Sequence, residues 1–413
     1  MKVLKFTTAG SVDDGKSTLI GRFLYDTKSL TTDQIEAIHK ASLRKGNNEL
    51  DLSLATDGLI AEREQGITID VAHIYFSTLK RKFIIADTPG HVEYTRNMIT
   101  GASNSQAALI LIDARNGVVE QTKRHLYITN LLRIKEVIVC INKMDLVNFD
   151  EKVYYAISAD VQKYSQGLYH NDFKLHFIPI SAKLGDNVVE KSKNMNWYSD
   201  VPLLSYLENV KIEPEESLPA RFSVQYVIRT DNDQKRDYRA YAGKVKSGTL
   251  KTGDTIVALP VGRTSKIKAI ERFDETLKEA HAGESVSILL EDDIDISRGN
   301  LIVKADQQPS SAKELDATIC WMTSDKFNPS SKFILQQGVS QTPAKLDAVN
   351  RILDPATLNY SDTTEIYLNA IADVKVRCAS TVFTDKYEDN PACGNFILID
   401  SQSNNTVAVG FVR

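Results

Sequence analysis

Apolar residues in the first half of the chain follow two alternating patterns. Short runs rich in Val, Ile and Leu alternate with longer segments in which apolar positions recur every three or four residues. The short runs are typical of buried strands, and the longer period is typical of helices. We predict strands over Val3–Ala9, Phe83–Ala86, Ala108–Asp113, Val137–Asn142 and Phe177–Ser181. We predict helices over Ser17–Tyr25, Ile35–Arg44, Glu120–Leu132 and Glu151–Tyr164, with Thr31, Thr32 and Asp33 as N-cap candidates for the second.

This alternation indicates an α/β domain whose mostly parallel sheet has helices on both faces. The pattern changes at Glu213–Pro219, a short acidic segment flanked by prolines that has the composition of a linker. Beyond it, short β-rich segments are separated by glycine turns, a spacing typical of β-barrels. A second polar break, Asp306–Ser311, divides this half. We therefore predict an α/β domain over residues 1–213 and β-barrels over 219–305 and 312–413.

Composition excludes several classes of protein. Of the 413 residues, 50 are Lys or Arg and 54 are Asp or Glu, a net charge of −4 that argues against a protein coating nucleic acid. The longest apolar run, Ala107–Ile112, is too short to span a membrane, and the N-terminal residues lack a secretory pattern. The four cysteines form no CxxC pair, so neither a disulfide scaffold nor a zinc ribbon is expected. We expect a cytoplasmic protein with neither a membrane nor a nucleic acid as partner.

A phosphate-binding loop is predicted between the first strand and the first helix. In order, its residues are Gly10, Ser11, Val12, Asp13, Asp14, Gly15, Lys16, Ser17 and Thr18. The glycines let backbone N–H groups point at a phosphate, and Lys16 can neutralise oxygens of the β- and γ-phosphates. The Ser17 hydroxyl is suited to ligate Mg²⁺. In its strand–loop–helix context, this pattern predicts a nucleoside triphosphate site.

Three further motifs follow predicted strands at their carboxyl ends, where open α/β sheets bind nucleotides. They are Asp87-Thr88-Pro89-Gly90, Asn142-Lys143-Met144-Asp145 and Ser181-Ala182-Lys183. Asp87 can hold Mg²⁺ through water, and the Gly90 amide can reach the γ-phosphate. The Asp145 carboxylate can accept from the N1–H and the N2 amine of guanine, whereas adenine presents an acceptor at N1. With Asn142 and the Ala182 amide on the N7/O6 side, the motifs predict a guanine-nucleotide site.

In addition to Lys16, two residues are candidates for the hydrolysis step. Thr68, within the polar stretch Glu62–Ile69, could ligate Mg²⁺ when a γ-phosphate is present and so order this stretch as a switch. His91 directly follows Gly90, where a side chain can orient the attacking water. The other histidines show no metal-binding spacing, so we predict structural roles for them.

The amino-acid sequence around these motifs resembles that of a known family. The informative segments are Gly10–Arg22, Leu24–Asp26, Asp57–Ala72, Tyr94–Met98 and Tyr238–Gly243. The order of the motifs resembles the translation-factor GTPases of the elongation-factor-Tu type, which carry two β-barrels after the GTPase domain. Within that superfamily, these segments are most similar to the GTPase (large) subunit of heterodimeric bacterial sulfate adenylyltransferase. The similarity is dense over residues 1–305, whereas the sequence Gln336–Gln341 differs from the His-Gly-Thr motif of the family.

The resemblance implies that the chain binds GTP and Mg²⁺ and couples GTP hydrolysis to adenylation of sulfate. That reaction converts ATP and sulfate into adenosine 5′-phosphosulfate and pyrophosphate. A separate small subunit of the ATP-pyrophosphatase type would hold ATP and sulfate, in keeping with the absence of an SGGxDS-type or HxGH motif here. By the same resemblance, Ser17, Thr68 and Asp87 form the metal shell, His91 positions water, and Val12 and Ile67 form an apolar gate beside it.

Two alternatives remain open at this stage. A translation-type GTPase delivering aminoacyl-tRNA would use the same core motifs, although the near balance of charge over residues 219–413 disfavours it. A regulatory switch that only assembles a complex would hydrolyse GTP slowly, whether or not ATP and sulfate are present. Turnover measurements distinguish these alternatives from the coupled enzyme.

Overall fold

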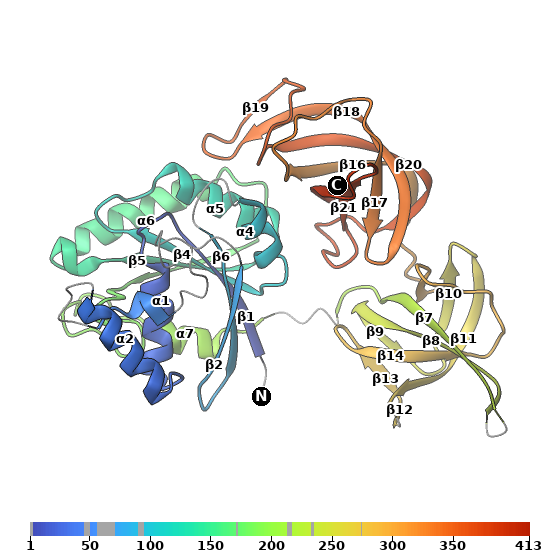
Figure 1. Ribbon diagram of the computed structural model, residues 1–413, viewed down its shortest axis with the longest axis horizontal. Coiled ribbons are helices and arrows are strands. Elements are labelled where there is room, and N and C mark those ends of the chain that lie inside the picture. The colour runs from blue at the N-terminus through green and yellow to red at the C-terminus, as the bar shows by residue number, and fades with distance from the viewer. Residues whose placement is uncertain are drawn as a thin grey trace. The chain divides into compact units, whose positions relative to one another are not determined.

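The computed structural model describes residues 3–44, 50–55, 71–89, 95–170, 172–212, 217–232, 235–273 and 275–413, without the side chains of residues 95, 231, 232 and 235–237. The chain divides into two compact units (Figure 1). Unit 1 comprises Met1–Ile212 with Pro355–Leu358, and unit 2 comprises Glu213–Asp354 with Asn359–Arg413. Each unit has its own sheets and its own hydrophobic core.

Unit 1 is built on a six-stranded sheet with the strand order β2-β3-β1-β4-β5-β6. The strands are β1 (Val3–Ala9), β2 (Ala72–Ser77), β3 (Lys82–Asp87), β4 (Ala107–Asp113), β5 (Glu136–Asn142) and β6 (Lys174–Pro179). All neighbours pair in parallel except β2, which runs antiparallel to β3 at the edge. Strands β4 and β5 are buried along their whole length, so their continuous apolar runs are explained by cover on both faces.

Helices cover both faces of this sheet, as predicted. They are α1 (Lys16–Asp26), α2 (Thr32–Arg44), α4 (Thr95–Ala102), α5 (Glu120–Leu131), α6 (Glu151–Ser165) and α7 (Leu203–Asn209), with short 3-10 turns η1 (Leu52–Ala55) and η3 (Met144–Val147). Figure 1 shows α4, α5 and α6 on one side of the sheet and α1, α2 and α7 on the other. Of the N-cap candidates for α2, Thr31 has this role, because its hydroxyl accepts from the Gln34 amide while the Gln34 side chain accepts from the Thr31 amide.

The first sheet of unit 2 closes into a barrel. Its strands are β7 (Arg221–Asn232), β8 (Lys235–Ser247), β10 (Thr255–Leu259), β11 (Arg263–Arg272), β12 (Glu275–Leu277), β14 (Ser285–Leu290) and β15 (Leu301–Lys304). Their order is β10-β15-β7-β8-β14-β11-β12, and a further β10–β11 pairing completes the ring. The short strands β9 (Thr249–Lys251) and β13 (Glu279–His281) form a separate pair.

The last sheet closes in the same way. It contains β16 (Ser310–Trp321), β17 (Phe333–Gln337), β18 (Ser340–Asp354), β19 (Asn359–Ser361), β20 (Ile371–Thr384), β21 (Asn395–Asp400) and β22 (Thr406–Val412). The order is β17-β21-β22-β16-β20-β18-β19, with β17–β18 as the closing pair.

Strand length in the barrels differs from the short segments that we predicted. Strands β18 and β20 have 15 and 14 residues, and β7 and β8 have 12 and 13. Their ladders contain register shifts, for example between Val224 and Tyr226 and between Leu346 and Ala348. Such irregularities bend a strand, so one long strand can follow the curvature of a barrel without a turn.

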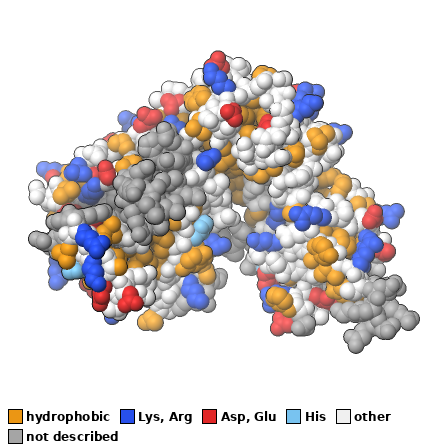
Figure 2. Space-filling model, in the orientation of Figure 1, with side chains coloured by type: hydrophobic (Ala, Val, Ile, Leu, Met, Phe, Trp, Pro, Cys, Tyr) orange, Lys and Arg blue, Asp and Glu red, His pale blue; other side chains and the backbone are white. Residues whose placement is uncertain are grey.

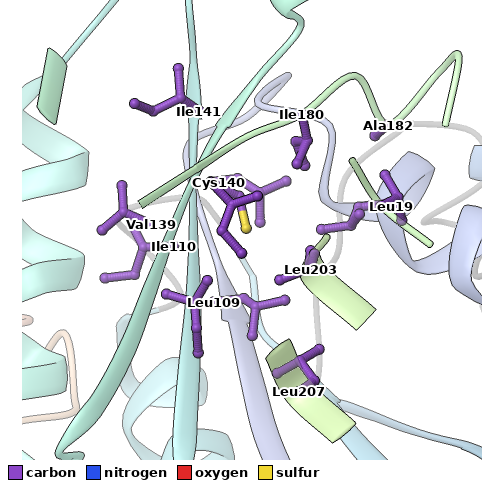
Figure 3. Close-up of a cluster of buried hydrophobic side chains, with 14 of the residues drawn as sticks. Leu19, Leu109, Ile110, Val139, Cys140, Ile141, Ile180, Ala182, Leu203 and Leu207 are labelled. Atoms are coloured by element: carbon purple, nitrogen blue, oxygen red, sulfur yellow. The ribbon is translucent and has the colours of Figure 1, made fainter. Parts of the chain in front are cut away.

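No helix among the described residues is long and apolar enough to cross a membrane. All four cysteines are buried and free, in agreement with the prediction that no disulfide scaffold exists. On the face drawn in Figure 2, basic and acidic side chains both occur on each unit among hydrophobic ones. Figure 3 shows part of the unit 1 core, where Leu19 of α1 and Ala182 belong to the same cluster as Cys140 of β5.

Candidate nucleotide-binding site

The predicted phosphate-binding loop joins β1 to α1 at the carboxyl edge of the sheet. Its turn is fixed internally, because the Ser11 amide donates to Asp14 Oδ2 at 2.6 Å and the Asp14 amide donates to the Ser11 carbonyl at 3.2 Å. Gly15 has φ +92°, and a Cβ atom there would lie 2.4 Å from Asn142 Nδ2. Both the backbone conformation and the close approach therefore require glycine at this position.

Lys16 is the first residue of α1, and it is buried at the loop. Its Nζ donates to the Gly10 carbonyl at 3.0 Å, which places the ammonium group against the loop backbone. Burial lowers the pKa of Lys16, whereas the nearby carboxylates of Asp87, Asp14 and Asp13 oppose that shift. A cation held in this way is suited to neutralise phosphate oxygens that enter the loop.

Asp87 ends β3 beside the loop and is held there by β1. The Thr8 hydroxyl donates to Asp87 Oδ1 at 2.9 Å, and the Thr88 hydroxyl donates to the Thr8 carbonyl at 2.6 Å. The Asp87 carboxylate and the Ser17 hydroxyl are oxygen ligands of the kind that Mg²⁺ prefers, with phosphates and water completing its shell. Across the described ranges, no group of three His, Cys, Asp or Glu side chains could hold a metal ion by itself. The donor set thus fits a magnesium ion that arrives with a nucleotide.

Asn142, the last residue of β5, connects the phosphate-binding loop to the loop that contains Ser181–Lys183. We call this second loop the base-binding loop, because its motif is predicted to face the base. Its Nδ2 donates to the Asp14 carbonyl at 2.7 Å, and its Oδ1 accepts from the Ala182 amide at 2.9 Å. We predicted Asn142 and the Ala182 amide on the N7/O6 side of the base, and in the structure they are hydrogen-bonded to each other. Their contacts with the base stay predictions. Asn142 therefore fixes the spacing between the two loops.

Asp145 is positioned by the loop that follows β6. The Ser181 hydroxyl donates to Asp145 Oδ1 at 2.7 Å and accepts from the Leu184 amide at 3.2 Å. The predicted strand Phe177–Ser181 ends earlier, at Pro179, so Ser181 leaves the sheet and turns toward Asp145. Met144 is fully buried in the core beneath this site.

Asp113 and Arg115 belong to the site, although the sequence analysis missed them. Asp113 ends β4 opposite Asn142, and its Oδ2 lies 3.0 Å from Lys143 Nζ and 2.6 Å from Arg115 Nη2. Burial alone would raise the pKa of Asp113, but hydrogen bonds from Arg115 and Lys143 outweigh it and lower the pKa to about 2. The signal available in the sequence was an acidic residue at the carboxyl end of a predicted strand.

Several predicted residues lie outside the described residues. They are Thr68, Gly90 and His91, together with the proposed switch stretch Glu62–Ile69. The structure therefore brings together the phosphate-binding loop, Asp87, Thr88, Pro89, the Asn142–Asp145 motif and the Ser181–Lys183 loop. The hydrolysis roles of Thr68 and His91 stay predictions.

Comparison with known protein families agrees with this architecture. Residues 1–215 match the Elongation factor Tu GTP binding domain, residues 240–303 match Elongation factor Tu domain 2, and residues 314–413 match the GTP-eEF1A C-terminal domain-like family. The predicted fold class, a GTPase domain with a mostly parallel sheet followed by two β-barrels, is confirmed. The domain boundaries at 213/219 and 305/312 stay predictions.

Sulfate adenylyltransferase subunit 1 of Psychromonas ingrahamii is 46% identical over 412 residues, which cover 99% of this chain and 87% of that protein. The chain belongs to the sulfate adenylyltransferase subunit 1 family. The subunit 1 of Bacteroides thetaiotaomicron is 45% identical over 422 residues, covering 99% of this chain and 86% of that protein. The bifunctional enzyme CysN/CysC of Mycobacterium tuberculosis is 45% identical over 413 residues, covering 99% of this chain and 67% of that protein.

Membership of the sulfate adenylyltransferase subunit 1 family confirms the resemblance found in the sequence and favours it over the translation-factor alternative. Among solved structures, the Ski7 GTPase-like domain of S. cerevisiae bound to GTP has a TM-score of 0.53 at 19% identity, covering 100% of this chain and 97% of that chain. That likeness concerns the fold alone. The departure at Gln336–Gln341 is accommodated within the last barrel, where Gln337 Nε2 donates to Thr384 Oγ1 at 2.9 Å and to the Cys393 carbonyl at 2.6 Å.

Proposed function

We propose that the chain is the GTP-hydrolysing subunit of a sulfate adenylyltransferase. It couples GTP hydrolysis to the formation of adenosine 5′-phosphosulfate and pyrophosphate from ATP and sulfate. The observation that carries this proposal is the 46% identity to a sulfate adenylyltransferase subunit 1 over nearly the whole chain. The hydrogen bonds that join the motifs predicted to bind a guanine nucleotide support it.

The residues of the site have distinct roles in this proposal. The loop from Gly10 to Thr18 binds the phosphates through its N–H groups, with Lys16 against the β/γ oxygens. Ser17, Thr68 and Asp87 would hold Mg²⁺, which neutralises charge that develops on the phosphates. His91 orients water for attack on the γ-phosphate. Asp145 accepts from the N1–H and N2 amine of guanine, while Asn142 and Ser181 hold the base-binding loops in place.

The proposal includes a second protein. A small subunit of the ATP-pyrophosphatase type holds ATP and sulfate and performs the transfer, while this chain supplies the GTP-dependent conformational change. The γ-phosphate of GTP orders the segments that contain Thr68 and His91, and the ordered surface favours one state of the partner. We place the complex in the cytoplasm, where ATP and GTP are available.

The direct test is GTP hydrolysis by the full chain co-expressed with its small-subunit candidate. We expect that ATP and sulfate together stimulate GTP turnover strongly, whereas either alone does not. Thr68→Ala should retain GDP binding and lose this stimulation, and Asp160→Asn on the exposed side of α6 serves as a matched control. Turnover that responds to ribosomes instead of ATP and sulfate would contradict the proposal.

A further inference from the structure

Arg22 connects the helix of the phosphate-binding loop to the loop that follows β6. It lies on α1, six residues after Lys16, and its side chain is only 18% exposed. Its Nε donates to the Ala182 carbonyl at 3.2 Å, its Nη2 donates to the Lys183 carbonyl, and its Nη1 lies 3.4 Å from Asp26 Oδ1. One guanidinium group therefore binds two successive carbonyls while a carboxylate on the same helix holds it in place.

These two carbonyls decide how the base-binding loop presents its amides. A trans peptide is planar, so its N–H points away from its own C=O. With the Ala182 and Lys183 carbonyls fixed on Arg22, the amides of Lys183 and Leu184 must point away from Arg22. The Leu184 amide indeed donates to Ser181 Oγ, which donates in turn to Asp145 Oδ1. The orientation set by Arg22 is thus passed on to the carboxylate expected to bind guanine.

Ala182 has two other attachments, and neither replaces its contact with Arg22. Asn142 holds the Ala182 amide, and the Ala182 side chain is buried in the core with Leu19 (Figure 3). Both fix the position of Ala182, whereas Arg22 binds the carbonyls of the two peptides that follow. Gly185 lies next to Arg22, since a Cβ atom there would be in van der Waals contact with Arg22 Cδ at 3.7 Å, and its φ of +89° favours glycine.

We propose that Arg22 is a positioning residue for guanine recognition. By fixing the peptides after Ala182 and Lys183, it sets the direction of the Lys183 amide, which we place on the O6 side of the base. Because Arg22 shares α1 with Lys16 and Ser17, one helix contacts both the phosphate-binding loop and the base-binding loop. The inference rests on the proposed GTP-binding function and adds to it the residue that determines how O6 is distinguished.

The test compares GDP with 6-thioguanosine 5′-diphosphate, using the full chain and calorimetric titration. The thio analogue keeps the N1–H and N2 amine but replaces O6 by sulfur, a weaker acceptor. We expect Arg22→Met, which keeps the aliphatic stem, to weaken GDP binding about tenfold, the equivalent of one hydrogen bond. Binding of the thio analogue should change less than about twofold, so the preference for GDP decreases.

Two further variants complete the design. Arg22→Lys should lose about threefold in GDP affinity, because an ammonium group cannot bind both carbonyls in one fork. Arg133→Met removes a comparably buried arginine whose Nη1 lies 2.9 Å from Asp172 Oδ1, and it should leave the GDP preference unchanged. Equal losses for both nucleotides in Arg22→Met, or no loss, would overturn the inference. A wild-type chain that binds no GDP would instead overturn the proposed function itself.

Discussion

Two aspartates at the same edge of the unit 1 sheet have opposite electrostatic environments. Asp14, on the phosphate side, and Asp113, on the base side, are both buried. Burial raises the pKa of Asp14 to about 6, and the hydrogen bond from the Ser11 amide only partly offsets this. Asp113 has a pKa of about 2, because the donors of Arg115 and Lys143 outweigh its burial.

The difference shows that burial alone does not determine the charge of a site. Donors that surround a carboxylate decide whether it remains ionised. The base side is already neutralised by its own cations and needs no ligand to balance it. The phosphate side combines a single lysine with three carboxylates, so negative groups outnumber positive ones there, and the metal that accompanies a nucleotide would add positive charge beside them. The following predictions test this contrast.

The largest effect is expected for Asp145→Asn on the base side. The variant loses the carboxylate that accepts from two guanine donors, so GDP affinity should fall by at least about a thousandfold. Binding of xanthosine diphosphate should improve, because the asparagine amide can donate to the O2 atom of xanthine. Calorimetric titration with both nucleotides measures the change, with Asp160→Asn as the control. Retained guanine preference would mean that Asp145 does not contact the base.

Asp113→Asn should destabilise the folded chain by about 2–3 kcal/mol at pH 7, because it leaves Arg115 and Lys143 without their anionic partner. The pKa of Asp113 is lower in the folded chain than in the unfolded one. Its contribution is therefore present above about pH 4 and is lost as the pH falls toward about 2. Urea unfolding at several pH values would reveal this dependence. Equal stability of variant and wild type at pH 7 would contradict the ion-paired assignment.

Gly15→Ala should weaken GDP binding by about thirtyfold, because the new Cβ would collide with Asn142 Nδ2 and the positive φ is unfavourable for alanine. Gly253 offers a matched control, since its φ of +88° is nearly the same and no atom lies within 4 Å of the position that a Cβ would take. Gly253→Ala should therefore show only the backbone cost of about 1–2 kcal/mol in stability and normal nucleotide binding. Identical behaviour of the two variants would indicate that the contact with Asn142 is unimportant.

Asp14→Asn should have the smallest effect and the opposite pH dependence. The folded-state pKa of Asp14 lies above its unfolded value, so the folded chain loses stability as the pH rises from about 4 to about 6. Asparagine cannot ionise, so the variant should be more stable than wild type by about 1 kcal/mol at pH 7.5, and this gain should vanish below about pH 4. A gain that is independent of pH would exclude titration of Asp14 as its cause.

Local sequence patterns predicted most elements of unit 1. In these elements the spacing of apolar residues reflects both which side chains are buried and whether the segment is a helix or a strand. Strand β1 has its predicted bounds, and α5 and α6 differ from theirs by one residue. Strand β2 was missed, since an edge strand with alternating exposure lacks the continuous apolar run that marked its neighbours. The long barrel strands were missed because their bulges interrupt the period of two by which strands are recognised.

The candidate site was predictable wherever its chemistry is concentrated in a short motif. Asp113 and Arg22 were not assigned roles, because each acts on residues that are distant in sequence. Asp113 contacts Lys143, and Arg22 contacts a loop 160 residues away. Such relationships arise from strand order and helix packing, which no local pattern contains.

The bridge formed by Asn142 has a kinetic consequence. Because it joins the phosphate-binding loop to the Ala182 amide through protein atoms alone, the two halves of the site are held at a fixed distance from each other. Little conformational entropy is then lost when a nucleotide enters, so association should be fast. Differences in affinity among variants of this site should consequently appear mainly in the rate at which the nucleotide departs.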